Sequence, residues 1–272
     1  MWCPWGWRES CSVRRLAVVV AVLVTGLLPA GSAGPAGAEA AGVTLRVLTW
    51  NTHWEDPDHL AEVVSASGAD VVALQEVDVY KQRSGCRHQA FDMAEKLGMQ
   101  ARVGANIRSR DECGTGRQSI YGDALLSRHP ILEWRHVLLP NHGGEQRGLL
   151  ETVLEVDGQR VRVVSTHLEY GSASERKTQA EAVAAHLESS TEPVVVMGDM
   201  NGEPHDSALA PLRAAFTDAW EATGDGDGFT NPSSNPRRRI DYVFFRGLTP
   251  ATVEVLDSKA SDHLAVRADL VL

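Results

Sequence analysis

The sequence predicts an α/β protein in which two mixed β-sheets pack face to face and helices cover the outside. Apolar runs with the length and alternation of strands occur about ten times, and about four stretches have the spacing of amphipathic helices. Some of these strands are joined by tight turns and others by helices. Because a purely parallel sheet needs a crossover helix at most connections, mixed sheets fit this order better. No internal repeat or linker divides the chain into two domains.

Strands and helices alternate in the first half of the chain. Pro57 fits the first turn of a helix and Gly68 its end, while Gly98 ends a second helical stretch. Residues 102–118 are polar, and we expect a loop there. In chain order we predict a strand at 44–51, a helix at 56–67, a strand at 70–74, a helix at 88–97, and strands at 119–126 and 137–139.

The second half begins with a hairpin and ends with three strands. Asp157-Gly158 between two alternating runs is a strong hairpin signal, and Ser172 with Glu175 fits a capping box that begins a helix. We predict strands at 147–156, 159–166, 194–197, 239–245, 252–256 and 264–270, and helices at 172–187 and 207–215.

Residues 1–40 have the layout of a secretory signal peptide followed by a small-residue linker. Arg8, Arg14 and Arg15 precede an apolar run at 16–28, which is too short for a comfortable membrane span. An N-terminal membrane anchor is the alternative. Cleavage near residue 33 or 40 would leave a domain at 41–272 of about 230 residues, enough for one large core. We therefore expect a secreted, monomeric protein without stable membrane insertion.

The chain is acidic, with 26 Lys and Arg against 36 Asp and Glu and a formal net charge of −10. The first 40 residues contribute one positive charge, so the domain that remains is more negative by one unit. Such a protein does not coat nucleic acid by bulk electrostatics. A site for phosphate would need a bound cation or a local basic patch.

Only Cys86 and Cys113 remain after the predicted signal segment. Two cysteines in an exported protein are expected to pair, and this pair would close a polar loop. A disulfide over such a loop stabilises the fold by about 3 kcal/mol when it is unstrained. Two free thiols are the alternative, and these cysteines show no metal-binding spacing.

Polar side chains follow many of the apolar runs. Asp199 can orient or deprotonate a water molecule, and Asn201 can donate to an oxyanion without adding charge. Glu76 follows another buried run, where a carboxylate is costly unless a cation or donors satisfy it. The full set of such residues is Asn51, Glu76, His167, Asp199, Asn201, Asp241, Asp262 and His263. Each alone fits an ordinary turn, but together they are the inventory of metal-assisted phosphoester hydrolysis.

The residue types favour a hard cation. Mg²⁺ keeps several of its waters and needs few protein carboxylates, so one glutamate is enough to suggest it, with Mn²⁺ as an alternative. Zinc is disfavoured because the polar set has no cysteine and no His-rich zinc spacing.

Six short motifs span nearly the whole mature chain: Thr49-Trp50-Asn51, Leu74-Gln75-Glu76, Ser165-Thr166-His167-Leu168-Glu169, Gly198-Asp199-Met200-Asn201, Arg239-Ile240-Asp241-Tyr242-Val243 and Ser261-Asp262-His263. In this order they resemble the endonuclease/exonuclease/phosphatase superfamily, which includes deoxyribonuclease I, apurinic endonucleases, tyrosyl-DNA phosphodiesterases and neutral sphingomyelinases. The resemblance implies a four-layer α/β/β/α sandwich and Mg²⁺-dependent phosphoester cleavage.

The resemblance also implies roles for the polar residues. Glu76 corresponds to the principal metal ligand, with Asn51 near the metal and phosphate and Asp262 as a second carboxylate on the metal side. Asp199 corresponds to the residue that positions or deprotonates water, and Asn201 to one that orients a phosphate oxygen. By the same comparison, His263 contacts phosphate and is polarised by Asp241, while His167 lies on the scissile phosphate.

One position departs from the family pattern. Many nucleases of the family have Asn-x-Asp at the first motif, whereas this chain has His53 at the third position. The change removes a carboxylate near the metal, and a plain packed histidine is the alternative interpretation. Candidate phosphate contacts are Arg147, Arg176 and Arg239, the last in a basic run that would otherwise be a solvated loop.

These features favour a secreted Mg²⁺-dependent phosphodiesterase that acts on nucleic acid. A sphingomyelinase or phospholipase C-like lipid enzyme is the main rival, and it would be expected to expose an apolar hairpin for membrane entry. No such hairpin is obvious in the sequence, and Trp134 with Leu138-Leu139 is the only stretch to consider. A phosphomonoesterase for small metabolites is a third reading. A binding module without activity is disfavoured because every expected catalytic position is filled.

Overall fold

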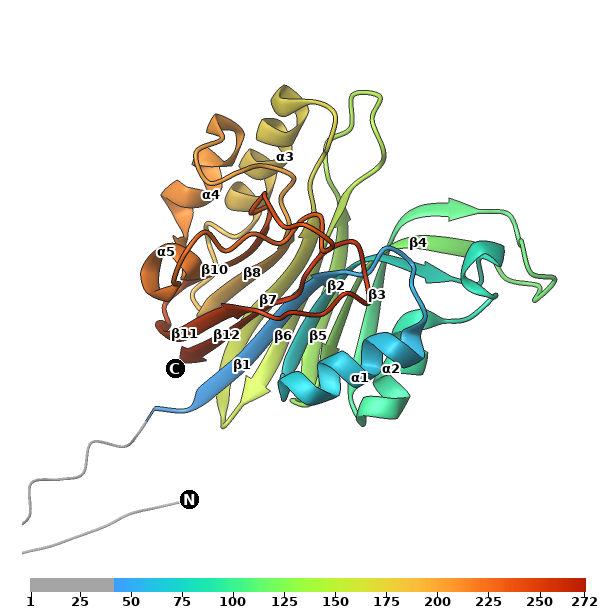
Figure 1. Ribbon diagram of the computed structural model, residues 1–272, viewed down its shortest axis with the longest axis horizontal. Helices are drawn as coiled ribbons and strands as arrows, with labels where there is room; N and C mark the ends of the chain where they lie inside the picture. The colour runs from blue at the N-terminus through green and yellow to red at the C-terminus, as the bar shows by residue number, and fades with distance from the viewer. Residues whose placement is uncertain (1–41) are drawn as a thin grey trace, which may run out of the picture. The chain divides into compact units, whose positions relative to one another are not determined.

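A computed structural model of the chain describes residues 42–272, which form one unit. The signal segment predicted at residues 1–40 lies outside the described residues. Two six-stranded sheets lie face to face (Figure 1), which confirms the predicted sandwich. In the described part of the chain, no helix combines the length and apolar character that crossing a bilayer requires.

The first sheet has the strand order β11-β12-β1-β2-β4-β3 and the second has the order β5-β6-β7-β8-β10-β9. The strands of the first sheet are β1 (Thr44–Asn51), β2 (Val71–Val79), β3 (Gln100–Ser109), β4 (Ser119–Ser127), β11 (Thr249–Val255) and β12 (Val266–Val271). Those of the second are β5 (Ile131–Leu138), β6 (Gly148–Val156), β7 (Gln159–His167), β8 (Val194–Asp199), β9 (Thr217–Asp218) and β10 (Asp241–Arg246).

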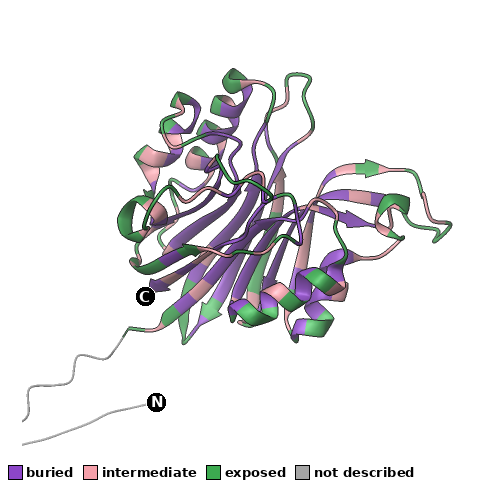
Figure 2. Cartoon of the chain, in the orientation of Figure 1, coloured by how far each residue is buried: buried purple, intermediate pink, exposed green. Residues whose placement is uncertain are grey.

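Helices cover both outer faces and make the sandwich four layers thick. The helices are α1 (Pro57–Ser67), α2 (Gln89–Leu97), α3 (Ala173–His186), α4 (Ala210–Ala215) and α5 (Ala219–Thr223). Leu60 of α1 and Met93 of α2 pack against β1 and β2, while Val183 of α3 packs against the outer face of the second sheet. Side chains such as Val71 and Val195 fill the space between the sheets, and Figure 2 shows the central strands buried along most of their length.

Two parallel pairs within the sheets determine where polar residues gather. β1 and β2 are parallel and joined by α1, and β7 and β8 are parallel and joined by α3. Both pairs therefore present their carboxyl ends at an edge of their sheet, which is where ligands bind in α/β proteins. The register places Asn51 beside Gln75 and His167 beside Asp199.

The helix ends agree with the capping residues read from the sequence. Asp56 accepts a hydrogen bond from the Asp58 amide at the start of α1, and Gly68 ends that helix in the left-handed conformation with φ = 66°. Ser172 accepts from the amide of Glu175 at the start of α3, but the Glu175 carboxylate accepts from the amide of His142, so only the Ser172 half of the predicted capping box forms.

The prediction of a loop at 102–118 was wrong in its first half, because β3 occupies Gln100–Ser109. β3 is an edge strand whose backbone pairs with β4, so main-chain hydrogen bonds hold it where apolar side chains are few. Its buried polar residue, Asn106, bonds to Asp123 of β4 at 2.9 Å. The strand expected at 137–139 is also longer, since β5 begins at Ile131, and α5 was not predicted.

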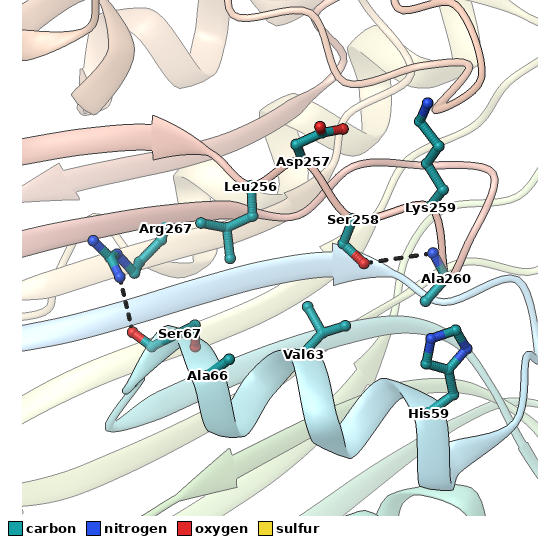
Figure 3. Close-up of a pocket in the computed structure, with 10 residues that line it drawn as sticks. All are labelled: His59, Val63, Ala66, Ser67, Leu256, Asp257, Ser258, Lys259, Ala260 and Arg267. Atoms are coloured by element: carbon teal, nitrogen blue, oxygen red, sulfur yellow. Dashed lines mark hydrogen bonds between the residues drawn. The ribbon is translucent and has the colours of Figure 1, made fainter.

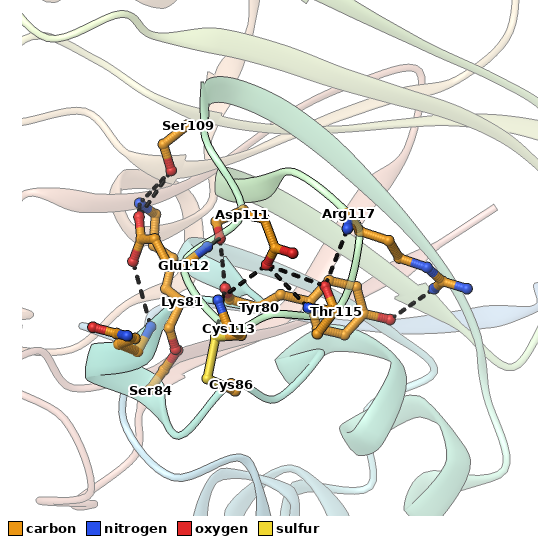
Figure 4. The surroundings of a disulfide bond; sticks show 12 residues. Tyr80, Lys81, Ser84, Cys86, Ser109, Asp111, Glu112, Cys113, Thr115 and Arg117 are labelled. Carbon is orange, nitrogen blue, oxygen red and sulfur yellow. Dashed lines mark hydrogen bonds and ion pairs between the residues drawn. A yellow bond between two sulfur atoms is a disulfide. The ribbon is translucent and has the colours of Figure 1, made fainter.

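Cys86 and Cys113 form a disulfide, as predicted, and it ties the β3–β4 turn to the segment after β2 (Figure 4). Lys81 supports the same junction because its ammonium lies 3.0 Å from Glu112. The bond joins residues 27 positions apart in a region where no residue of 80–88 or 109–118 is buried. The covalent link therefore replaces packing there.

Replacing both cysteines by serine should lower the free energy of unfolding by about 3 kcal/mol, since the unfolded chain would regain the entropy of the closed loop. For a domain of this size we expect the melting temperature to fall by about 10 °C. Calorimetry of the double variant measures this. An equal melting temperature for the variant and the oxidised protein would contradict a stabilising role.

Candidate active site

A cavity of about 430 Å³ lies at the edge where the ends of the two sheets meet. It is lined by seven of the eight predicted polar residues: Asn51, Glu76, His167, Asp199, Asn201, Asp262 and His263. The eighth, Asp241, lies behind His263 and is hydrogen-bonded to it. A larger cavity of about 540 Å³ between α1 and residues 256–260 (Figure 3) contains none of them.

A distortion of β2 turns Glu76 toward this cavity. The pairing of β2 with β4 shifts between Leu74 and Val77, as in a β-bulge, and Glu76 has φ = 58°. A left-handed backbone is unfavourable for glutamate, so the surrounding sheet must impose it. The strained position leaves the Glu76 carboxylate half-buried at the cavity wall rather than inside the sandwich.

Gly198 allows β7 and β8 to approach closely enough to bring Asp199 beside His167. Its φ is +154°, and a Cβ at this position would lie 1.8 Å from the carbonyl oxygen of Thr166. Only glycine fits there, since no side-chain movement relieves a clash with a backbone. The Nε2 atom of His167 lies 3.3 Å from Oδ2 of Asp199.

Asn51 connects the two acidic side chains of the site. Its Nδ2 atom donates to Oε1 of Glu76 at 3.1 Å and to Oδ2 of Asp199 at 3.2 Å. The amide of Asn201 donates to the other oxygen of Asp199 at 2.8 Å. Asp199 is 2% exposed, so these donors replace the water that its carboxylate loses on folding.

The loop that carries Asp262 and His263 is anchored on the end of β1. Ser261 Oγ donates to the Asn51 carbonyl at 2.8 Å, and Trp50 Nε1 donates to the His263 carbonyl at 2.9 Å. These bonds join residues more than 200 positions apart in sequence. The last motif of the chain is thereby held against the first.

His263 lies between two carboxylates. Its Nδ1 atom is 2.8 Å from Oδ2 of Asp241, and its Nε2 atom is 3.8 Å from Oδ2 of Asp199. Burial lowers the pKa of His263, but the charges of Asp241 and Asp199 outweigh it and raise this pKa to about 10. Burial, with the Asp241 charge, raises the pKa of Asp199 to about 7. The imidazole is therefore a cation at neutral pH and Asp199 can exchange a proton there.

His167, in contrast to His263, is uncharged at neutral pH. Burial lowers its pKa well below the usual range, and the positive charges of Arg147 and His263 lower it further. Arg147 Nη1, which can only donate, lies 3.1 Å from Nδ1 of His167. The ring is therefore neutral, and its Nε2 atom lies 2.9 Å from Nδ2 of Asn201 and 3.3 Å from Oδ2 of Asp199.

The residues at the cavity fit a hard cation. Glu76 offers a half-buried carboxylate with only an amide as hydrogen-bond partner, and Asp262, whose side chain is 49% exposed, offers a second. His53 approaches Asp262 with its Nδ1 atom 3.9 Å from Oδ1. Asp199, Asp241 and His263 are also close enough to share an ion. Because His263 is a cation engaged with both carboxylates, Glu76 and Asp262 fit the metal better.

Of the three candidate arginines, only Arg147 lines the cavity. Arg176 is buried and pairs with Asp206 at 2.9 Å, and Arg239 is buried and pairs with Asp218 at 2.7 Å. Both guanidinium groups therefore hold the fold together instead of facing a phosphate. The structure places Arg238, the neighbour of Arg239, at the cavity.

Three further residues line the cavity that sequence reasoning missed: Glu145, Tyr170 and Asn231. Tyr170 directly follows the Ser165–Glu169 motif, and this neighbouring position is the sequence feature that could have indicated its place at the cavity. Glu145 precedes Arg147 by two positions and lies 2.7 Å from it. Asn231 belongs to a loop for which the sequence holds no comparable signal.

Residues 48–263 match the Endonuclease/Exonuclease/phosphatase family, and the chain belongs to that family. Its members are phosphoester-hydrolysing enzymes.

Relatives include proteins of quite different length. The chain is 28% identical over 208 residues to Protein cwh43 of Schizosaccharomyces pombe, a match that covers 73% of this chain but 18% of that protein. The structure of an endonuclease/exonuclease/phosphatase from Beutenbergia cavernae is 27% identical, with a TM-score of 0.65 over 84% of this chain and 72% of that one. D. rerio TDP2 complexed with a single-strand DNA product shares the fold at 19% identity, with a TM-score of 0.66 over 84% and 99% of the two chains.

The two pKa values predict a bell-shaped dependence of kcat/KM on pH. Activity should rise as pH increases through about 7, where Asp199 loses its proton, and fall near 10, where His263 loses its own. In Asp241→Asn both limbs should move to lower pH, because the Asp241 charge raises both pKa values. Initial rates across this pH range measure the shift. An alkaline limb that stays in place in Asp241→Asn would contradict the assignment to His263.

Proposed function

We propose that this chain is a secreted, Mg²⁺-dependent phosphodiesterase that hydrolyses nucleic acid by direct attack of water on phosphorus. The arrangement of Asp199 supports the proposal most. Its buried carboxylate contacts Asn51 and Asn201 and lies within 3.8 Å of the His263 imidazole. A base with a pKa near neutrality beside a fixed cation suits attack on a negatively charged phosphate.

Each residue has a defined part in this reaction. Asp199 accepts the proton of the attacking water as the new oxygen–phosphorus bond forms. The bond from phosphorus to the leaving oxygen breaks in the same step, and the released alkoxide takes a proton from solvent water. The His263 cation and the Asn201 side chain stabilise negative charge on the phosphate oxygens. Asp241 keeps His263 protonated and oriented. Arg147, 6% exposed, adds a second positive charge at the cavity wall.

Glu76, Asp262 and the Oδ1 atom of Asn51 would hold the cation. Oxygen donors of this kind suit Mg²⁺, with Mn²⁺ as the alternative. When bound, the metal would neutralise charge on the phosphate and on the leaving oxygen.

Nucleic acid is the favoured substrate because the cavity combines arginines with aromatic residues. Arg147 and Arg238 lie on its wall together with Trp54, Tyr121 and Tyr170. Such a combination binds phosphates and bases together. The shared fold of D. rerio TDP2, whose structure was solved with a DNA product, is consistent with this choice.

A lipid phosphodiester is the second candidate, and one feature favours it. Leu132, Trp134 and Leu138 are each more than 40% exposed and lie on the edge strand β5. Leu139, by contrast, is buried. An apolar stripe of this kind can contact a membrane surface.

Export through residues 1–40 with a domain at 41–272 is also part of the proposal. The charged, apolar and small-residue order of the N-terminal segment supports it. The Cys86–Cys113 bond is consistent with it, because disulfides persist mainly in oxidising compartments. We expect the protein to act as a monomer.

Asp199→Asn should lower kcat by about 10³-fold while leaving the fold intact, since it removes the base without changing the shape. Glu76→Gln should instead raise the Mg²⁺ concentration needed for half-maximal activity. Asp157→Asn, in the β6–β7 turn, is the matched control for loss of one carboxylate. Rates against Mg²⁺ concentration, with circular dichroism of each variant, test both expectations. Near-normal activity in Asp199→Asn and Glu76→Gln would refute the site.

A substrate panel tests the reaction and its specificity. We expect cleavage of plasmid DNA or RNA with Mg²⁺ and none with excess chelator. Sphingomyelin, phosphatidylcholine and small phosphomonoesters complete the panel under the same two conditions. Turnover of a lipid alone would favour the second candidate, and turnover that persists in chelator would contradict the role of a metal.

A further inference from the structure

Tyr170 presents an aromatic ring to solvent at the mouth of the catalytic cavity. It lies between β7 and α3, lines the cavity and is 66% exposed, the largest value among the exposed large apolar side chains of the described residues. Exposing so much of a tyrosine ring forgoes the stabilisation that its burial would bring. A ligand that covers the ring would recover it.

The other two aromatic rings of the cavity already have partners. Trp54 has the guanidinium of Arg83 4.0 Å from its ring centre and the His53 ring 3.9 Å away. Tyr121 is 7% exposed and also lies beneath Arg83. Within residues 42–272, Tyr170 is therefore the aromatic residue of the cavity whose ring contacts no other ring or cation.

Buried polar groups hold the backbone of Tyr170 in place. Nη1 of Arg176 donates to the carbonyl oxygens of Glu169, at 2.9 Å, and of Tyr170, at 3.1 Å. The Glu169 carboxylate accepts from the Gly171 amide at 2.7 Å, and the Glu169 amide donates to Gln179 at 2.8 Å. The peptide groups on both sides of Tyr170 are thus fixed.

An ordered backbone that carries a solvent-exposed aromatic ring, as at Tyr170, suits a binding surface. Ordering of a loop normally opposes association, and here hydrogen bonds to the backbone order this loop on folding. Arg176, which does not face the phosphate, acts through this loop as a positioning residue. The hydrogen-bonded loop that carries Tyr170 lies beside the proposed catalytic centre, since Tyr170 is three positions after His167.

We infer that Tyr170 is a stacking platform that selects phosphodiesters carrying a nucleobase on the ester group that remains attached to the phosphate after cleavage. This inference rests on the proposed function and specifies the substrate class of the same site. Stacking depends on the π-face rather than on a hydrogen-bond pattern, so the platform would accept any base. It would give no such stacking advantage to a substrate with an alkyl group.

Two diesters with the same leaving group test the inference. Thymidine 5′-(4-nitrophenyl phosphate) and methyl 4-nitrophenyl phosphate both release 4-nitrophenolate, and only the first carries a base. We expect the wild-type kcat/KM to favour the thymidine ester. Tyr170→Ala should reduce that preference about tenfold, mainly through KM, which is within the range of base stacking. Tyr170→Phe keeps the ring and should retain the preference.

Phe91→Ala is the matched control, because Phe91 is 52% exposed on α2 and does not line the cavity. It should leave both rates unchanged. A preference that survives in Tyr170→Ala, or an equal loss on both esters, would overturn the platform while the proposed function stands. If the wild-type protein hydrolyses neither ester with Mg²⁺, the proposed function fails and the inference fails with it.

Discussion

The hydrogen bond from Asn51 to Asp199 joins the two sheets at the point where the chemistry is proposed to occur. Asn51 ends a strand of the first sheet and Asp199 ends a strand of the second. The same amide nitrogen also reaches Glu76, so one neutral group separates two carboxylates that would repel each other. The relative position of the sheets therefore sets the distance between the proposed base and the proposed metal ligand.

Burial of this cluster of charges has a free-energy cost, and it also strengthens the electrostatic interactions of the site. Asp199, Asp241 and His263 are each less than 10% exposed, and together they carry both signs of charge. Removing one charged side chain of such a group leaves the other buried charges unpaired. The loss of stability is then larger than the net stability that the intact group contributes. The low dielectric of the site also strengthens every interaction that stabilises charge on a phosphate. The outward face of the site remains open, with Asp262 and Tyr170 exposed to solvent.

The sequence carried enough information to predict the layers of the fold and the members of the polar cluster. Capping residues, the Asp157-Gly158 turn and the apolar runs each act over a few residues, and these predictions agree with the structure. Polar residues at strand ends could be gathered into one site because strand ends meet at one edge of a sheet.

Features that depend on distant partners could not be predicted in the same way. Arg176 and Arg239 have the chemistry of phosphate ligands. Each instead forms an ion pair with a distant aspartate, Arg176 with Asp206 30 positions away and Arg239 with Asp218 21 positions away. The sequence of β3 has little of the apolar alternation that marks a strand. Its backbone hydrogen bonds to β4 hold it in the sheet instead. Glu76 faces the cavity because of a bulge that no local signal in the sequence marks.

The division of the site between two sheets has a consequence for how the chain can be handled. Neither half of the sandwich contains a working set of groups, since Glu76 and Asn51 belong to one and Asp199 and His167 to the other. A fragment or split version that forms only one sheet would be catalytically silent even if it were well folded. Under the proposed function, turnover would report intact assembly, and reconstitution from two separately expressed pieces could be followed by the return of catalysis alone.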